Sequence, residues 1–490
     1  MEYESIRFSG KVLDNVHGFI EYTEAEDQIM HLLLFKRLQS IKQLSLVNWV
    51  FPGSEHTRFI HSLGVMHIAD RIATHLGLSP QERKIVRLAG LLHDIGHYPL
   101  SHVCEFPYRN RMELHSSECF CKSVNTKVLG DIEKLLSSPS IDFMQAAKQG
   151  HHEEIGALVI RNSQEIIQII TNECGEDAVD IICDMITGNV ERDVPNTPLL
   201  VQILHSELDA DGIDYMLRDA VFSGTSFGSF EVDQLIGSMV SKDFNGKPIL
   251  CISHKGIAAA DQYLINKFFS FSQVIFNKHT SILEWMAEQI ISWMQEFSIH
   301  FPKKDALRNK WISGDPEKKD YLSFNDNYFW SSLKSIIENP AKEVFPPYVR
   351  FLCEQLLKHQ ELEYIENSEY KIISNNKTLT KNSLLETEIV QNIHNWDDKI
   401  AVLSRREITK HRPYAKFIEL IKLPDSLDGK IDDDEIEKHQ TAMNTLRLMD
   451  GICVADEETP LHLLCDDRRS LMQHLCDSEL VILRAYNFPV

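Results

Sequence analysis

The chain has 490 residues, of which 43% are apolar and 25% charged, proportions typical of a soluble globular protein with one large core and smaller attached regions. Its formal net charge of −22 argues against general binding to nucleic-acid backbones, which needs a basic surface, although a locally positive pocket could still bind a phosphate ester. Ten scattered cysteines without a C-x-x-C pair predict reduced thiols. No apolar run approaches the roughly 20 residues of a membrane span, and the acidic first residues are unlike a signal peptide. We therefore expect a cytoplasmic protein that does not enter membranes.

Helical periodicity dominates residues 1–300. The most complete start signal is Ser79 as an N-cap, Pro80 in the first helical position and Glu82 closing a capping box, followed by an apolar stripe that runs up to His93. Apolar side chains recur with helical spacing in several other stretches. These stretches are residues 27–44, 59–77, 153–187, 199–220 and 257–298.

The pattern changes after residue 300, where helical and β-like segments alternate with polar ones. We predict a mainly α fold, in which residues 1–300 form a helical core and residues 301–490 form a smaller α+β C-terminal region that serves oligomerisation or regulation. The C-terminal segments are a charged, irregular stretch at 300–330, a helix at 331–360, a polar stretch at 361–400 and β-like runs at 400–403, 451–455 and 480–486.

His93 and Asp94 are the strongest chemical signal in the chain. Adjacent histidine and aspartate offer one nitrogen and one oxygen ligand, which suits a divalent transition metal that must also contact phosphate oxygens. His97 and His102 follow closely, and the whole group stands directly behind an apolar helix. Buried ionisable groups need partners, and here a metal and an anion are the natural ones.

Two other segments complete a set of metal ligands. His61 lies on the apolar face of its expected helix, where an isolated histidine would more often be a packed core residue. Asp211, Tyr215 and Asp219 are spaced four residues apart, which places them on one helical stripe with apolar neighbours that turn Asp211 inward. An inward carboxylate without a cation is costly. The resulting two-histidine, two-carboxylate set is His61, His93, Asp94 and Asp211.

Longer strings around these residues carry a resemblance to a known family. The chain resembles the HD-domain superfamily of metal-dependent phosphohydrolases, and within it the deoxynucleoside triphosphate triphosphohydrolase branch, which includes dGTPase-like enzymes and the sterile-alpha-motif HD proteins (here without that motif domain). The resemblance is strong over about residues 8–300 and implies an HD-domain helical core. The strings are Val50 to Gly53, Thr57 to Val65, His93 to His102 and Asp214 to Asp219, in addition to the H…HD…D pattern.

The resemblance implies roles for the matched residues. His61, His93, Asp94 and Asp211 would hold Mn, Fe or Mg, and His97, His102 and Asp94 would be catalytic. Imidazoles can donate a hydrogen bond or a proton to phosphate oxygens and to the leaving group near neutral pH. At the triphosphate, the resemblance implies Arg58 and His152, with His151 and His115 as competitors for the role of His152. At the sugar, it implies Gln43 and Asp219 near the 3′-hydroxyl and Leu44 near the 2′ position. Tyr215 and Lys267 are further implied substrate-binding residues.

The chain also departs from the family pattern. Gly212 stands where relatives often carry a lysine, Ile275 falls where they place a sugar-stacking tyrosine, and Lys267 takes the place of a phosphate-binding arginine. The positions of the family's guanine-nucleotide effector site fall on His31, Lys36 and Gln39. We therefore expect a rearranged grip on the triphosphate and an effector other than GTP.

The leading interpretation is a metal-dependent enzyme that hydrolyses deoxynucleoside triphosphates to deoxynucleoside and inorganic triphosphate, which would control or deplete these pools and could extend to phage defence. Such a protein would bind a nucleotide effector and form a tetramer or hexamer, as relatives do. Two alternatives stay open. One is an HD phosphohydrolase acting on a nucleoside monophosphate or cyclic dinucleotide, and the other is a nucleotide-sensing regulatory subunit with little turnover.

Overall fold

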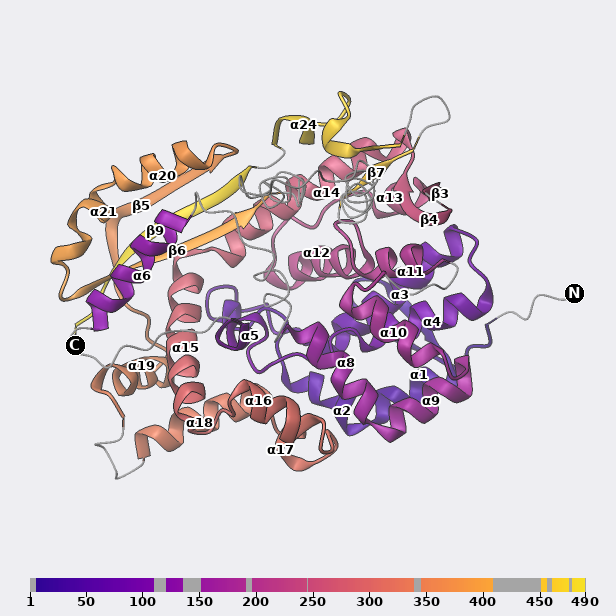
Figure 1. The fold of residues 1–490 in the computed structure, drawn as a ribbon, viewed down its shortest axis with the longest axis horizontal. Coiled ribbons are helices and arrows are strands. Elements are labelled where there is room, and N and C mark those ends of the chain that lie inside the picture. The colour runs from indigo at the N-terminus through magenta and orange to yellow at the C-terminus, as the bar shows by residue number, and fades with distance from the viewer. Residues whose placement is uncertain are drawn as a thin grey trace, which may run out of the picture.

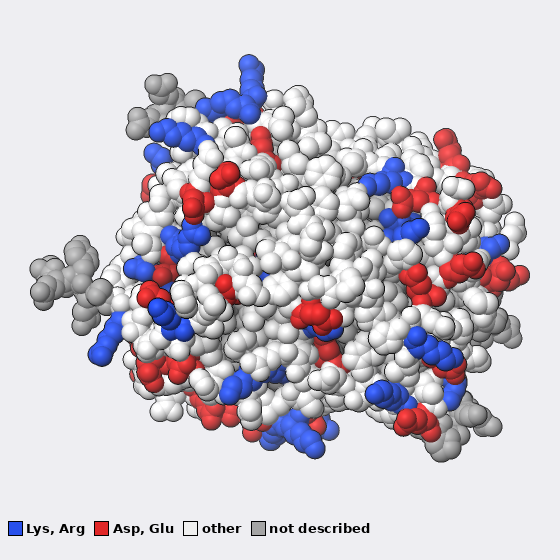
Figure 2. Space-filling model, turned by 180° about the vertical axis from the view of Figure 1, so that it is seen from behind, with Lys and Arg blue, Asp and Glu red and all other residues white. Residues whose placement is uncertain are grey.

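The computed structural model describes residues 6–109, 120–134, 151–190, 196–244, 246–338, 345–408, 451–455, 461–475 and 478–489. The fold is mainly helical, as predicted, with small sheets (Figure 1). Among the described helices, none is both long and apolar enough to cross a membrane. On the face seen from behind, Lys and Arg side chains are interspersed with Asp and Glu (Figure 2). This face therefore carries charges of both signs.

The N-terminal part begins with an antiparallel hairpin of β1 (Gly10–Asp14) and β2 (Gly18–Tyr22). The helix expected over residues 27–44 is wrong as a single element, because Leu32 is extended, with ψ of 142°. The break separates α1 (Glu24–His31) from α2 (Leu33–Lys36) and a 3₁₀ turn at Arg37–Ser40. Ile29 from the first piece and Leu34 and Phe35 from the second pack into the same core, so the apolar spacing continues across the break.

The next two helices match the prediction and carry the site. α3 (Arg58–His75) packs against α4 (Pro80–Leu92). The capping box forms at the start of α4: the Ser79 hydroxyl accepts from the Glu82 amide at 3.3 Å, and the Glu82 carboxylate accepts from the Ser79 amide at 2.9 Å. Because α4 ends at Leu92, His93 and Asp94 leave the helix at its C-terminal end.

The remaining helices of residues 1–300 are shorter than the periodic stretches that predicted them. The stretch at 153–187 contains three helices, because Ser163 caps one and Gly175, with φ of 89°, ends another. The stretch at 257–298 is interrupted by a π-helical turn at Phe271–Ile275. The elements are α5 (His102–Arg109), α6 (Phe120–Lys134), α8 (His152–Asn162), α9 (Gln164–Cys174), α10 (Ala178–Thr187), α11 (Thr197–Leu204), α12 (Ala210–Ser223), α13 (Val232–Gly237), β3 (Met239–Phe244), β4 (Lys247–Ile252), α14 (Ile257–Ser270) and α15 (Lys278–Phe297).

The C-terminal residues mix helices and strands, as predicted, and the β-like runs at 400–403, 451–455 and 480–486 all fall in strands or beside them. The elements are α16 (Lys304–Ala306), a π-helical turn at Leu307–Ile312, α17 (Lys319–Leu322), α18 (Asp326–Glu338), α19 (Pro347–Leu357), β5 (Tyr364–Ser374), α20 (Lys377–Leu385), α21 (Glu388–Asn392), β6 (Lys399–Glu407), β7 (Cys453–Val454), β8 (His462–Leu463), α24 (Met472–Leu475) and β9 (Glu479–Asn487).

The two halves of the chain interleave. One sheet has the order β3-β4-β7-β8 and therefore joins strands from both halves, while the other has the order β5-β9-β6. α6 lies along that second sheet, far in sequence from its strands (Figure 1). The Asn125 side chain on α6 donates to the carbonyl of Lys399 at 3.1 Å and accepts from the amide of Ala401 at 3.0 Å. Segments from before residue 300 thus pack into the C-terminal sheet, and segments from after residue 300 extend the sheet of the N-terminal part.

Candidate active site

Three helices bring the expected metal ligands together. His61 lies in the first turn of α3, His93 and Asp94 directly follow α4, and Asp211 lies in the first turn of α12. His61 Nε2 is 2.9 Å from Asp211 Oδ1 and 3.8 Å from Asp94 Oδ2. His93 Nε2 is 3.4 Å from Asp94 Oδ1 and 3.8 Å from Asp211 Oδ1. Two nitrogens and two carboxylates at this spacing form a donor set suited to a divalent transition metal.

The two histidines are oriented so that Nε2 points into the cluster. His93 Nδ1 donates to the carbonyl oxygen of Gly90 at 2.8 Å, so a neutral His93 keeps its lone pair on Nε2. His61 Nδ1 donates to Asp214 Oδ2 at 2.7 Å, which leaves its Nε2 toward Asp211. His93 Nε2 is buried and has no hydrogen-bond partner among the described residues. A buried lone pair of this kind fits a metal ligand, and the hydrogen bonds at Nδ1 are those that orient ligating histidines.

Asp214 is a functional residue that the sequence interpretation missed. Besides His61, it contacts His17 Nε2 at 2.5 Å and receives two hydrogen bonds from Arg218, at 2.9 and 3.0 Å. Burial alone would raise the pKa of Asp214, but the charge of Arg218 and the hydrogen bonds with His17 and His61 hold it well below its usual range. Asp214 and Arg218 stand in one of the resembling strings, and their opposite charges four residues apart were the available signal.

The electrostatics of the cluster also favour a cation. Burial lowers the pKa of His61, but its hydrogen bonds with Asp211 and Asp214 outweigh burial and raise the pKa to about 10. For Asp94, burial raises the pKa, but Arg58 and the nearby histidines outweigh it and lower the pKa well below the usual range. A site that retains a proton this strongly carries excess negative charge, and a divalent cation would replace that proton.

Asp211 differs from the other ligands in its exposure. Its side chain is 39% exposed, whereas those of His61 and Asp94 are 0% and 1% exposed. The expectation that Asp211 faces the cluster agrees with the structure, but the carboxylate lies at the rim rather than in the interior. The cluster therefore opens to solvent on the α12 side.

A second group of histidines adjoins Asp94. His97 Nε2 lies 3.2 Å from Asp94 Oδ1, and the His97 ring stacks on the His152 ring with centroids 3.8 Å apart. His102 completes the group, and ligand atoms of the three histidines all lie within 4.8 Å of one another. Three imidazoles at this spacing can surround a phosphate oxygen, or hold a second cation if neutral.

Glu105 orients two of these histidines and was missed in the sequence. Its Oε2 accepts from His102 Nδ1 at 2.8 Å and is 3.2 Å from His152 Nδ1, so both rings turn Nε2 toward the group. The signal was the spacing of three residues between His102 and Glu105 on one helix. His151, the competitor of His152, is less buried and contacts Glu105 at 3.4 Å, while His115 lies outside the described residues.

Two of the histidines differ in charge. Burial lowers the pKa of His152, but Glu153 and Glu105 outweigh it and raise the pKa to about 9. Burial, together with the positive charges of Arg58 and His152, lowers the pKa of His97 well below its usual value. The group therefore offers an anion one charged and one neutral imidazole.

We expect Glu105→Gln to lower turnover by roughly 10–100-fold without loss of metal, the usual cost of removing a group that orients an active-site histidine. A glutamine side chain has a single acceptor oxygen and no charge. It would therefore keep only part of the hydrogen bonding to His102 and His152, and it would leave the charge of His152 unbalanced. The measurement is the maximal rate together with metal content. The matched control is Glu173→Gln, because the Glu173 carboxylate on α9 also pairs with a basic side chain, that of Lys84. Equal rates in the two variants would contradict the assignment.

Arg58 is buried and fully engaged by the protein. Its guanidinium donates to Asp94 Oδ2 at 2.9 Å, to the Ser101 hydroxyl at 3.0 Å and to the Gln43 carbonyl at 3.3 Å. It therefore lies beside the ligand cluster and would have to share these contacts to bind the triphosphate, a role that stays a prediction.

The residues assigned to the sugar lie on the loop after α2 and on α12. Gln43 is buried, and its Oε1 has no partner among the described residues. Leu44, next to it, is half-buried. Asp219 Oδ1 is 2.8 Å from His56 Nε2, so His56 is a further residue that the sequence interpretation missed. A free buried acceptor and an oriented carboxylate are suitable groups for a hydroxyl, and their roles stay predictions.

Packing explains the glycine at position 212. A Cβ there would lie 2.3 Å from the Tyr263 hydroxyl, so a lysine cannot occupy this position without moving Tyr263. Tyr263 is fully buried, and its hydroxyl has no partner among the described residues. One turn further along α14, Lys267 Nζ contacts Glu207 Oε1 at 3.1 Å. Tyr215, half-buried on α12, faces the same region, since the charge of Lys267 affects its pKa.

We expect Gly212→Ala to destabilise the protein by about 1–3 kcal/mol, the usual cost of overpacking. In an unhindered helix the same change would stabilise by roughly 1 kcal/mol, so a loss of stability would identify the contact with Tyr263. Adding Tyr263→Phe removes the hydroxyl and should recover most of the loss. Denaturant unfolding of the two single variants and the double variant measures this coupling, and strictly additive effects would contradict it.

The chain is similar to several known proteins. Residues 58–206 match the model of the HD domain family. The chain is 27% identical over 323 residues to an uncharacterized protein of Methanocaldococcus jannaschii, which covers 66% of this chain and 57% of that protein. It is 44% identical over 97 residues to the deoxynucleoside triphosphate triphosphohydrolase SAMHD1 of Bos taurus, which covers 18% of this chain and 16% of that protein. A solved hypothetical protein of Aquifex aeolicus has the same fold, with a TM-score of 0.63, 22% identity and coverage of 98% of this chain and 96% of that one.

Residues 58–206 therefore carry an HD domain that contains His61, His93 and Asp94, and the fold brings Asp211, which lies just beyond the matched residues, to His61 and His93. Over 97 residues the chain is similar to a deoxynucleoside triphosphate triphosphohydrolase.

Proposed function

We propose that this protein hydrolyses deoxynucleoside triphosphates to deoxynucleoside and inorganic triphosphate, with a divalent metal (Mn, Fe or Mg) as cofactor. The observation that supports this most is the position of Asp94, which contacts the metal-ligand cluster on one side and His97 on the other. Cleavage breaks the bond between the α-phosphorus and O5′, and water supplies the new oxygen on phosphorus and the proton on O5′.

The side chains would divide this reaction among them. A divalent metal held by His61, His93, Asp94 and Asp211 would polarise a phosphate oxygen and favour ionisation of water. His152, which is positively charged at neutral pH, would bind phosphate oxygens. His102 turns its Nε2 outward from Glu105, and its side chain is 65% exposed, so it could pass a proton to the leaving O5′.

Product analysis tests the proposal. Chromatography after incubating each dNTP with Mn, Fe or Mg should reveal deoxynucleoside and triphosphate in equal amounts. Orthophosphate with dNDP would indicate a different phosphohydrolase reaction. Because Lys267 already pairs with Glu207 and Gly212 has no cation, the same assay should include nucleoside monophosphates and cyclic dinucleotides. Tight nucleotide binding without any product would favour the regulatory alternative.

We further propose an oligomer larger than a dimer that responds to a nucleotide effector other than GTP. His31 and Gln39 are exposed and Lys36 is half-buried near the N-terminal helices, where the family places its guanine site. Their chemistry no longer matches a guanine base, although Lys36 could still contact phosphate. Light scattering with each nucleotide in turn measures the assembly. A monomer under every condition would contradict this proposal, as would GTP activation that depends on these positions. Depletion of cellular dNTP pools on expression, with or without phage infection, would test the biological role.

A further inference from the structure

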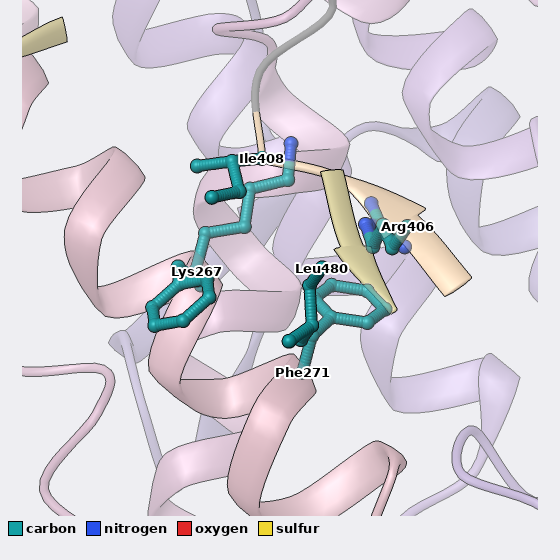
Figure 3. Close-up of a pocket in the computed structure, with 6 residues that line it drawn as sticks. Lys267, Phe271, Arg406, Ile408 and Leu480 are labelled. Carbon is teal, nitrogen blue, oxygen red and sulfur yellow. The ribbon is translucent and has the colours of Figure 1, made fainter. Parts of the chain in front are cut away.

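A second cationic feature lies between the helical core and the C-terminal sheet. Lys267 from α14 and Arg406 from β6 line one small cavity (Figure 3). The other walls are apolar and come from Phe268, Phe271, Ile408 and Leu480. The cavity measures about 10 Å³, which is room for about one water molecule or one ligand oxygen.

The charge around this cavity is unbalanced. Lys267 pairs with the buried Glu207 at 3.1 Å. The Arg406 guanidinium lies 3.3 Å above the centre of the Phe271 ring and has no carboxylate partner among the described residues. Asp209 acts on the pKa of Lys267 as well, so the charge of Lys267 is balanced by carboxylates. Arg406 supplies the positive charge of this cavity, and the apolar walls strengthen its attraction for an anion.

The neighbouring residue shows that the orientation of Arg406 is specific. Arg405 precedes it on β6, and side chains alternate between the two faces of a strand. Arg405 Nε contacts Glu479 Oε1 on β9 at 3.1 Å, so its charge is balanced outside the cavity. Arg406 is the arginine of this pair that faces α14.

The cavity adjoins the candidate active site through α12 and α14. Tyr215 lies one helical turn after Asp211, and Lys267 lies one turn after Tyr263, which contacts the position of Gly212. Burial raises the pKa of the Tyr215 hydroxyl, and the charges of Lys267 and Arg406 act on it in the opposite direction. Both cations are therefore close to the helix that carries a metal ligand.

We propose that Lys267 and Arg406 together bind the terminal phosphate of a polyphosphate substrate, so that a C-terminal strand completes the substrate site. This rests on the proposed function for the identity of the substrate. One phosphate oxygen would enter the cavity mouth between the two cations, and the rest of the triphosphate would extend toward Asp211. The planar Arg406 fork suits two oxygens of one phosphate, and Lys267 adds a point charge.

Calorimetry with inorganic tripolyphosphate on the full-length, metal-loaded protein tests this. Arg406→Gln should weaken binding by about 10–100-fold, the loss expected for hydrogen bonds to a charged group. Arg406→Lys, which keeps the charge without the fork, should weaken it less. The matched control, Arg405→Gln, should leave affinity within about twofold. If the protein hydrolyses dNTPs, Arg406→Gln should raise KM much more than it lowers kcat.

The outcomes separate this inference from the proposed reaction. Equal affinity of the Arg406→Gln, Arg405→Gln and unchanged proteins for tripolyphosphate would overturn the inference, even if dNTP hydrolysis were found. A selective loss in Arg406→Gln would support it even if the products were not deoxynucleoside and triphosphate. Thermal unfolding should be measured for each variant. If Arg406→Gln does not fold, the tripolyphosphate affinity of Arg406→Lys becomes the test. An affinity equal to that of the unchanged protein would then count against the inference.

Discussion

Asp211→Ala and Asp94→Asn should each strip the metal and abolish hydrolysis. Both carboxylates lie within 4 Å of the facing histidine nitrogens, so each change removes a charged oxygen ligand from a four-residue set. Loss of a group that only orients a metal-binding side chain costs about 10–100-fold in affinity for the metal. Loss of the metal-binding side chain itself should cost more. Elemental analysis of the purified variants, with activity at saturating metal, is the measurement.

The two variants also differ in a useful way. Asp211 is partly exposed, so its replacement should leave the fold nearly unchanged, whereas Asp94→Asn removes the buried partner of Arg58 and should also lower stability. The control for general charge effects is Asp233→Asn, because Asp233 is an exposed carboxylate that pairs with Arg71. Full metal occupancy in both site variants would refute the ligand assignment.

His97→Ala should lower the maximal rate by about 10²–10⁴-fold and leave the metal content unchanged, as expected for a group that positions a proton or hydrogen bond at the reacting phosphate. His97 is buried against His152 and close to Asp94, and its two ring nitrogens have no hydrogen-bond partner among the described residues. His102→Ala should lower the rate within the same range, and its exposed side chain makes a loss of folding stability small.

Rates and metal content must be compared in the same preparations. His474→Ala, an exposed histidine of α24, is the control for histidine removal in general. An unchanged rate in His97→Ala would make His97 a packing residue. Loss of metal together with activity would instead make it a ligand.

Local sequence patterns predicted the helices that carry the site. The capping box at Ser79 and Glu82 placed the start of α4 correctly, and its apolar stripe placed His93 and Asp94 at its end. A four-residue spacing put Asp211 and Tyr215 on one helix. These features depend on neighbours within a turn or two, which a sequence contains directly.

Long-range contacts could not be predicted in the same way. The break at Leu32, the close approach of Tyr263 to Gly212 and the position of α6 on the C-terminal sheet all depend on packing between distant segments. The residues that orient the site belong to the same class. They are His17, His56, Glu105 and Asp214, whose partners are mostly far away in sequence.

The sequence by itself therefore determined the fold class, the helices α3 and α4 and the candidate ligands His61, His93, Asp94 and Asp211, because local periodicity and residue chemistry are sufficient for those. Only the tertiary structure decided that Asp211 lies at an open rim, that Asp214 and Glu105 orient the histidines, and that Arg406 and Lys267 line one cavity. The physical reason is that burial, pKa and hydrogen-bond partners are properties of side chains from several segments packed together, and the order of residues does not specify that packing directly.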